Sequence, residues 1–183
     1  MMNTLKEAKT VNRKILLTVL ELAVVLLATP YIGIAHATPS ATVNGTITVL
    51  SGTQLKEIPL SDGNRLYRYA VTEQWSGDID AVGSTTNSIW LTHDLVIPPS
   101  GPPAGLPPPD YTINIFEVLT FQGNVLGQSG TFSMAIYLHF SMTENYGNWV
   151  ILGGTDGLAH LHGQGTESEP APFTYTYTGQ IHF

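Results

Sequence analysis

Residues 153–165 read GGTDGLAHLHGQG, and this stretch decides which fold the rest of the chain is expected to adopt. Its five glycines are balanced by Leu158, Ala159 and Leu161, which keep it apolar enough for a β-strand. A strand tolerates so many glycines where it coils sharply, turns a corner or packs close to another backbone. Closed, strongly curved barrels need such strands. We therefore predict that this stretch is a coiled strand of a small β-barrel.

The segments around this stretch support an all-β fold. From residue 38 onward, runs with period-two alternation are separated by turn residues, which is typical of a sandwich or barrel. Residues 41–50 are predicted as the first strand and residues 52–64 as a polar loop. We expect one domain over residues 38–183, a closed antiparallel barrel of about eight strands, the number that leaves a lumen for side chains or one small ligand.

Two of these runs carry a carboxylate on an otherwise apolar face. One run places Glu73 with Tyr67, Tyr69, Val71 and Trp75, and another places Glu117 with Ile113, Ile115, Leu119 and Phe121. If these faces point into the lumen, the carboxyl groups are buried, their pKa values rise, and they can serve as acid or base. Glu73 and Glu117 are therefore catalytic candidates. The alternative is a structural role, with Arg65, Arg68 or tyrosine hydroxyls as their partners.

A proline-rich segment interrupts the strand series. Residues 97–110 read IPPSGPPAGLPPPD and hold seven of the 12 prolines. Proline cannot donate to the interior of a β-ladder, so this segment is predicted as an extended surface loop that could cover a barrel mouth.

The N-terminal segment has the three parts of a secretory signal peptide. Lys6, Lys9, Arg13 and Lys14 precede an apolar run, and residues 35–37 read AHA, an A-x-A cleavage pattern. We predict that residues 1–37 are a signal peptide and that the protein is secreted or extracytoplasmic. The alternative is an uncleaved membrane anchor over residues 15–35, with the carboxylate of Glu21 in mid-span.

Without this leader the chain is strongly acidic. Three cations and twelve of the 14 acidic residues remain, a net charge near −9 (3 minus 12) with neutral histidine. Such a charge argues against nucleic acid and anionic membrane surfaces as partners, so contact with a membrane is expected only through the N-terminal segment. There is no cysteine, which excludes disulfides and thiolate chemistry. Asn44 begins the one glycosylation sequon, Asn-Gly-Thr.

Two glycine frames resemble a family of small prokaryotic barrels of unknown function. Residues 123–132 fit its G-x3-G-x2-G-[ST]-F signature, and residues 154–165 are similar to its G-T-G-x-L…G-x-G frame. Residues 75–79, WSGDI, are similar to its aromatic-S-G-D-[IL] segment. The resemblance extends over residues 69–183. Asp156 stands where this family has glycine, and the proline-rich insertion has no counterpart in it.

The same G-T-G frame recurs in allene oxide cyclases and dirigent proteins. The resemblance therefore implies their antiparallel, eight-stranded barrel, and it also implies self-association into a homo-oligomer. It implies a fold and not a chemistry, because the family has no established activity and no catalytic residue of the cyclases can be matched to a position here.

A possible metal site overlaps the opening stretch. Gly154-x5-His160-x-His162-x4-Glu167 satisfies most of the first cupin motif, and two imidazoles with a carboxylate suit iron or manganese. Three observations oppose this interpretation: residue 174 is Thr where the motif ends in Gly, only 16 residues follow Glu167, and the barrel family already explains the glycines. The alternative is that His160 and His162 are solvent-facing, and no metal or other cofactor is favoured.

The function expected from the sequence is a binding or structural module whose aromatic lumen could hold a small apolar ligand. The rival interpretation is an enzyme, either a cyclase or isomerase that works inside the lumen with Glu73 or Glu117, or a cupin-like metal-dependent oxygenase.

Overall fold

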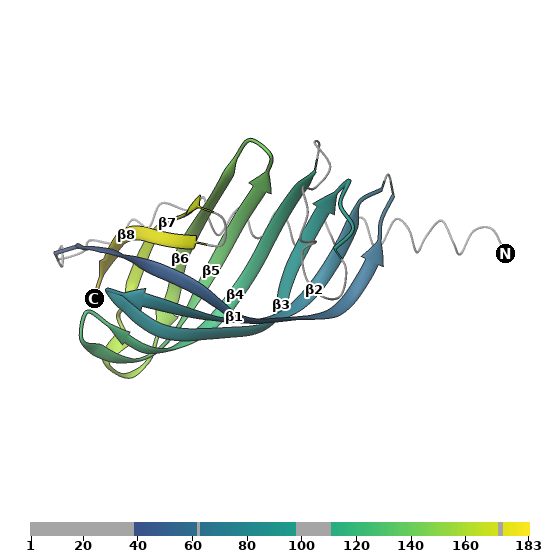
Figure 1. Cartoon of the computed structure of the whole chain (residues 1–183). Helices are drawn as coiled ribbons and strands as arrows, with labels where there is room; N and C mark the ends of the chain where they lie inside the picture. The colour runs from purple at the N-terminus through teal and green to yellow at the C-terminus, as the bar shows by residue number, and fades with distance from the viewer. Residues whose placement is uncertain (1–38, 62, 98–110, 172–173) are drawn as a thin grey trace, which may run out of the picture. The chain divides into compact units, whose positions relative to one another are not determined.

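The computed structural model describes residues 39–61, 63–97, 111–171 and 174–183, and these residues form one antiparallel β-sheet that closes on itself. Figure 1 shows β2 to β6 slanting side by side, with β7 and β8 next to them and β1 completing the ring. The strands are β1 (Ala41–Pro59), β2 (Arg65–Gly77), β3 (Ile79–His93), β4 (Thr112–Val125), β5 (Gln128–Ser141), β6 (Asn145–Gly154), β7 (His162–Ala171) and β8 (Thr174–His182).

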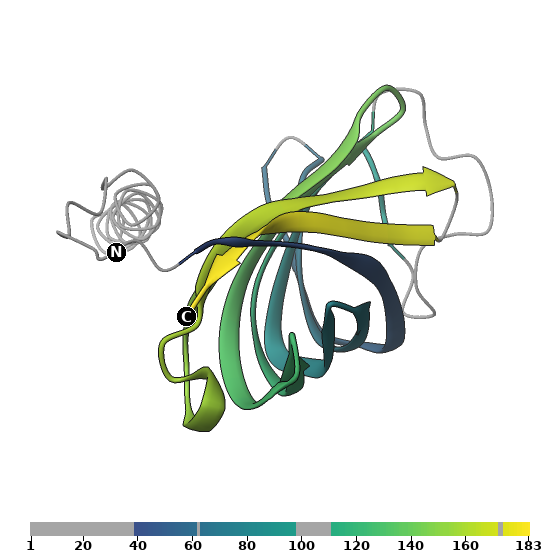
Figure 2. The same ribbon diagram turned by 90° about the vertical axis from the view of Figure 1, so that its left-hand side faces the viewer.

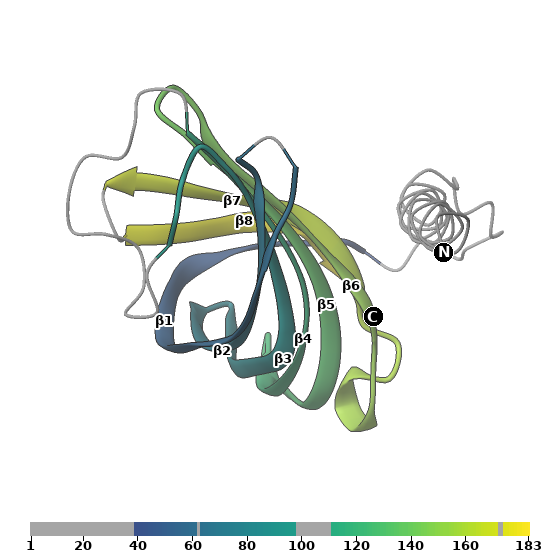
Figure 3. The same cartoon turned by 90° about the vertical axis from the view of Figure 1, so that its right-hand side faces the viewer.

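Each strand pairs antiparallel with the next along the chain, and β8 closes the ring by pairing with β1 from Ala41↔Ile181 to Ile47↔Tyr175. Figures 2 and 3 show the long β1 curving as it follows β2. Its pairing with β2 shifts register twice, between Val49 and Ser51 and between Gln54 and Lys56. Such bulges bend a strand, which is how one long strand can serve a closed sheet.

A bulge in β3 decides which of its side chains face the interior. The register of β3 with β4 shifts between Ser84 and Ile89. Before the shift the odd-numbered residues Ile79 and Ala81 are buried. After it the even-numbered residues face inward instead, and Ser88 and Thr92 are fully buried. Because the side-chain period of a strand is two, one extra residue moves the following side chains to the other face. The bulge therefore delivers the hydroxyl of Ser88 to the interior.

The interior holds two apolar clusters at opposite ends of the ring. The larger cluster is built around Trp75, Trp149, Phe121, Phe132 and Tyr177, and it fills the end where β1 begins. The smaller one contains Tyr67, Tyr69, Val71, Leu95, Ile97, Ile113 and Ile115, with Trp90, Tyr111 and Phe140 packed against it. Leu138 contacts both clusters. The closely packed aromatic rings mean that side chains fill the first end.

The all-β fold with eight antiparallel strands is confirmed. The inward faces predicted for β2 and β4 are also confirmed, since Tyr67, Val71, Trp75, Ile115 and Leu119 are all buried. The loop predicted over residues 52–64 is partly wrong, because β1 continues to Pro59. The leader (residues 1–37) and residues 98–110 of the proline-rich segment lie outside the described residues. Within the described part, no helix has the length and hydropathy needed to cross a membrane.

The prediction that residues 153–165 form one coiled strand is wrong. β6 ends at Gly154, a single 3-10 turn (η1, Asp156–Leu158) follows, and β7 begins at His162. Asp156 has a positive φ of 55°, a conformation that glycine adopts without strain, which explains why glycine suits this position. Gly165 has another reason: a side chain there would overlap the indole ring of Trp149. The stretch is thus a tight connection followed by a strand that accommodates a tryptophan.

Candidate functional site

Three glutamates from three strands are buried in the interior. Glu73 of β2, Glu117 of β4 and Glu167 of β7 are only 6%, 5% and 7% exposed. On β2, Glu73 lies between Val71 of the smaller cluster and Trp75 of the larger one. Glu117 has the same place on β4, between Ile115 and Leu119. The glutamates therefore form a carboxyl layer between the two apolar clusters, and we use this name below for Glu73, Glu117 and Glu167.

Glu73 and Glu117 have hydrogen-bond partners. The indole N–H of Trp75 donates to Oε2 of Glu73 over 3.2 Å. The side chain of Ser88 is hydrogen-bonded to Glu117, and Ser88 Oγ also accepts a 2.7 Å bond from the indole of Trp90. Burial raises the pKa of Glu73, although the Trp75 bond opposes the shift. Burial and the nearby charge of Glu73 raise the pKa of Glu117 to about 8.

Glu167 differs because one of its oxygens has no partner. Its Oε1 atom is buried and accepts no hydrogen bond within the described structure. Burial raises the pKa of Glu167 well above its usual value, and the charges of Glu73 and Glu117 raise it further. An unsatisfied buried acceptor costs about 1–3 kcal/mol, so a partner for this atom would be stabilising.

The carboxyl layer has no cation beside it among the described residues. Lys56 and Arg68 are exposed, and Arg65 forms an ion pair with Glu57 at the surface. Carboxyl groups that are buried together without a counter-charge favour their neutral form. The pKa values of all three carboxyl groups are accordingly raised, and a protonated member can donate as well as accept hydrogen bonds.

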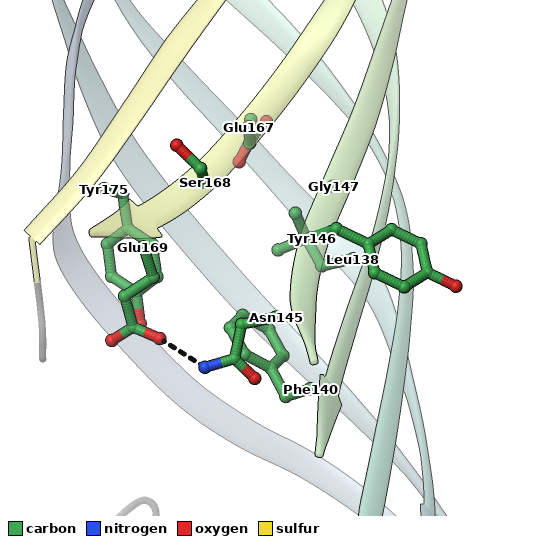
Figure 4. Close-up of a pocket in the computed structure, with 9 residues that line it drawn as sticks. All are labelled: Leu138, Phe140, Asn145, Tyr146, Gly147, Glu167, Ser168, Glu169 and Tyr175. Carbon is green, nitrogen blue, oxygen red and sulfur yellow. Dashed lines mark hydrogen bonds between the residues drawn. The ribbon is translucent and has the colours of Figure 1, made fainter. Parts of the chain in front are cut away.

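A shallow groove at the surface lies beside Glu167, near the end of the smaller cluster. Its apolar walls are Leu138, Phe140 and the ring of Tyr175, and Glu167 is among the residues that line it. Figure 4 shows Glu167, Glu169 and Tyr175 across from Leu138, Phe140 and Asn145, while the ring of Tyr146 points away. Asn145 Nδ2 donates to Glu169 Oε2 over 3.3 Å at the rim.

The groove is small. The space among its lining side chains is about 200 Å³ and is partly open to solvent. Its enclosed part has room for about one water molecule. Burial raises the pKa of the Tyr175 hydroxyl to about 12, and the negative charges of Glu169, Glu73 and Glu167 raise it further. The groove thus has an aromatic and aliphatic wall, and the unsatisfied oxygen of Glu167 is buried behind it.

The histidines of the cupin-like motif do not join Glu167. His160 lies in the turn after η1 and is exposed, whereas His162 begins β7, is exposed, and stacks on His182 with ring centroids 5.5 Å apart. Glu167 faces the interior. No group of three His, Asp or Glu side chains in the described part is arranged to hold a metal ion.

Asn44, the glycosylation candidate, is exposed in β1. Its backbone N–H and its side-chain amide both donate to Oδ2 of Asp78, over 2.9 and 3.0 Å. This amide nitrogen therefore has a hydrogen-bond partner in the folded chain.

Sequence reasoning placed Glu73 and Glu117 on inward faces, but it considered Glu167 only as part of a metal motif. The inward face of β7 reads Gly163, Gly165, Glu167 at every second position, and the buried Leu161 precedes the strand in the same alternation. The two glycines hide the alternation that reveals such a face. Counting glycine as compatible with an inward position would have found the third carboxylate.

Comparisons with known proteins agree on the fold. A family model described as "Protein of unknown function (DUF3224)" matches residues 43–178. A crystal structure of a protein with unknown function from the DUF3224 family of Shewanella oneidensis MR-1 is similar, with a TM-score of 0.57 and 16% sequence identity. The similarity covers 79% of this chain and 98% of that one. No curated protein matches the chain.

Proposed function

The chain belongs to the DUF3224 family, whose function is unknown, and we propose that its barrel is an extracytoplasmic binding module for a small ligand with an apolar body. The ligand enters the groove between β5–β6 and β7–β8. The observation that carries this proposal is the groove with apolar walls, formed by Leu138, Phe140 and Tyr175, that lies beside the buried Glu167. Ligand sites typically combine such walls with a few well-placed polar groups.

Two further features support the proposal. Phe140, one wall of the groove, packs against the smaller cluster, which contains the aromatic side chains of Tyr67 and Tyr69. The predicted signal peptide supports an extracytoplasmic location, and the glycine frames support kinship with the allene oxide cyclase and dirigent barrels. Both the location and the kinship are part of the proposal.

Acid–base catalysis in the lumen is the second candidate function. It is favoured by the pKa of Glu117, about 8, next to a second carboxyl group, since a general acid or base works best near the ambient pH. Glu73 and Glu117 are enclosed by packed side chains, however, and only 6% and 5% exposed. Glu167 is only 7% exposed as well, so no carboxyl group of the layer is accessible to a substrate, and binding in the apolar groove is the better-supported function.

Ligand-observed NMR with small neutral probes, such as 1-butanol and toluene, tests the binding proposal. We expect the probes to contact the full-length chain and to lose that contact in Asn145→Trp, which places a large ring at the rim of the groove. Asn148→Trp is the matched control, because Asn148 is also exposed on β6 but does not line the groove. Equal binding to both variants would contradict the proposed site.

A further inference from the structure

The outer face of the barrel carries a second depression, which we call the outer hollow. It lies across β1, β2, β3 and β4, whereas the groove beside Glu167 is lined by residues of β5 to β8. The outer hollow is open to solvent and has a volume of about 470 Å³. Sites for small molecules typically measure about 300–1,000 Å³, so it is large enough for a ligand.

A row of hydroxyl groups crosses the outer hollow from strand to strand. Its four residues stand directly opposite one another in the pairings Ser51↔Thr72, Thr72↔Ser84 and Ser84↔Thr120. Three of them are exposed and Thr72 is half-buried. Opposite side chains on neighbouring strands lie about 4.5–5.5 Å apart, and each hydroxyl both donates and accepts. This hydroxyl row therefore offers regularly spaced hydrogen-bond partners to a ligand.

The backbone itself shapes the outer hollow. Three neighbouring strand pairings change register around it: β1 with β2 just before Ser51, β2 with β3 between Tyr69 and Val71, and β3 with β4 between Ser84 and Ile89. Bulges bend a strand and redirect its side chains, and they are over-represented next to active sites. The depression is thus a feature of the sheet rather than a gap between side chains.

The absence of charge in the outer hollow narrows the class of ligand. None of the described residues that line it is acidic, basic or a histidine. Residues 38–183 carry a net charge near −9 (3 minus 12), and a field of this sign repels anions. A cation would find no carboxylate among these lining residues to pair with. The lining therefore suits a neutral ligand that is rich in hydroxyl groups.

An exposed aromatic ring lies next to the outer hollow on the same face. Val118 of β4 lines the hollow and is 53% exposed, and Phe116, the next outward residue of β4, is 44% exposed. The ring of Phe116 packs on that of Tyr137 with centroids 4.9 Å apart. The negative face of an aromatic ring attracts polarised C–H groups such as those on one face of a sugar ring. Phe116 and Thr120 are about 14 Å apart along the strand, a span that suits a short oligosaccharide.

We propose that the outer hollow binds a neutral oligosaccharide, with sugar hydroxyls on the hydroxyl row and the face of one sugar ring on Phe116. This site goes beyond the proposed function, because it uses other strands and another ligand chemistry than the apolar groove. It does not depend on whether the groove binds a ligand.

Ligand-observed NMR titration of the full-length chain with cellotriose and maltotriose tests the inference. We expect at least one of these neutral trisaccharides to bind. Its affinity should be the same at low and at physiological ionic strength, because salt screens only interactions between charges. Trigalacturonate, an anionic trisaccharide, should bind more weakly than the neutral one because the acidic chain repels it.

Variants locate the site. Thr72→Val and Thr120→Val keep the shape of the side chain and remove one hydroxyl each, and each should weaken binding by about three- to tenfold. Thr166→Val is the matched control, because Thr166 is exposed on β7 and does not line the hollow. Phe116→Leu should also weaken binding, whereas Phe116→Trp keeps an aromatic face and should retain it. Melting curves by circular dichroism separate a loss of affinity from a loss of fold.

The possible outcomes are distinct. If neither neutral trisaccharide binds, or if the folded Thr72→Val and Thr120→Val variants bind as tightly as Thr166→Val, the inference is wrong. Trigalacturonate binding as tight as that of the neutral trisaccharide would also overturn it. Asn145→Trp, which blocks the groove, should leave trisaccharide binding unchanged. A loss of binding in that variant would place the sugar in the groove and refute the outer hollow as its site.

Discussion

Replacement of Glu117 by glutamine should make the protein more stable at neutral pH. Glu117 is 5% exposed, and its pKa is raised from 4.5 to about 8, mainly by burial and then by the charge of Glu73. A carboxyl group with a higher pKa in the folded than in the unfolded state binds more protons when folded. Stability is then unaffected below pH 4.5 and decreases as the pH rises towards 8.

The size of the effect follows from the shift. Each pH unit between the two pKa values costs about 1.4 kcal/mol, so the cost accumulated between pH 4.5 and pH 7 is about 3 kcal/mol. Glutamine has nearly the same shape and keeps an oxygen for the hydrogen bond with Ser88. It cannot ionise, so Glu117→Gln should escape this cost.

Urea unfolding of the full-length chain between pH 4.5 and pH 8 measures this difference. The free energies of unfolding of wild type and Glu117→Gln should converge near pH 4.5 and separate to about 3 kcal/mol in favour of the variant at pH 7. Glu144→Gln, which removes an exposed charge, should stay within about 0.5 kcal/mol of wild type throughout. A difference that does not change with pH, or a variant less stable than wild type at pH 7, would refute the reasoning.

Three further predictions concern the scaffold and the leader. Gly165→Ala should lower the free energy of unfolding by about 3 kcal/mol or more, because the new methyl group overlaps the indole of Trp149. Gly52→Ala is the control: nothing lies within 4 Å of the new methyl group, so the free energy of unfolding should change by less than about 0.5 kcal/mol. Urea unfolding of both variants measures the two values. Leu126→Asn should raise the melting temperature, because Leu126 has a φ of 49° in the two-residue β4–β5 turn, where asparagine is less strained; an unchanged or lower melting temperature would contradict this. If the signal peptide is cleaved after Ala37, the intact mass of the exported protein, measured by mass spectrometry, should correspond to residues 38–183. A mass that corresponds to the uncleaved chain would contradict the signal peptide.

The sequence revealed those strands whose inward side chains are large. β2 and β4 each alternate without interruption, so the inward positions of Glu73 and Glu117 could be predicted from period two alone. The bulge in β3 could not be predicted, because it depends on how this strand bends between its two neighbours. Ser88, which reaches the interior through that bulge, therefore carried no signal in the sequence.

The inward position of Glu167 could not be predicted, because the residues before it on the same face of β7 are glycines. Residues 163 and 165 are glycine on the inward face of β7, and Gly165 lies where a side chain would overlap the ring of Trp149 from the neighbouring strand. That cause is tertiary and appears in the sequence only as a glycine-rich run. The run predicts a single coiled strand, and for Glu167, two residues after it, the sequence indicates only a place in the cupin-like motif. The structure instead places a turn around Asp156 and makes Glu167 the third inward acid.

Packing does not explain why the carboxyl layer exists. An apolar side chain of similar size at Glu117 would join the two apolar clusters, and replacement of buried charged groups by apolar ones is often neutral or stabilising. The raised pKa values of all three glutamates mean that each reduces stability near neutral pH. A residue that lowers stability without a structural benefit is expected at a functional site. The glycine-rich connection is explained by Trp149 and the turn at Asp156, so the carboxyl layer is the part of this barrel that requires a function.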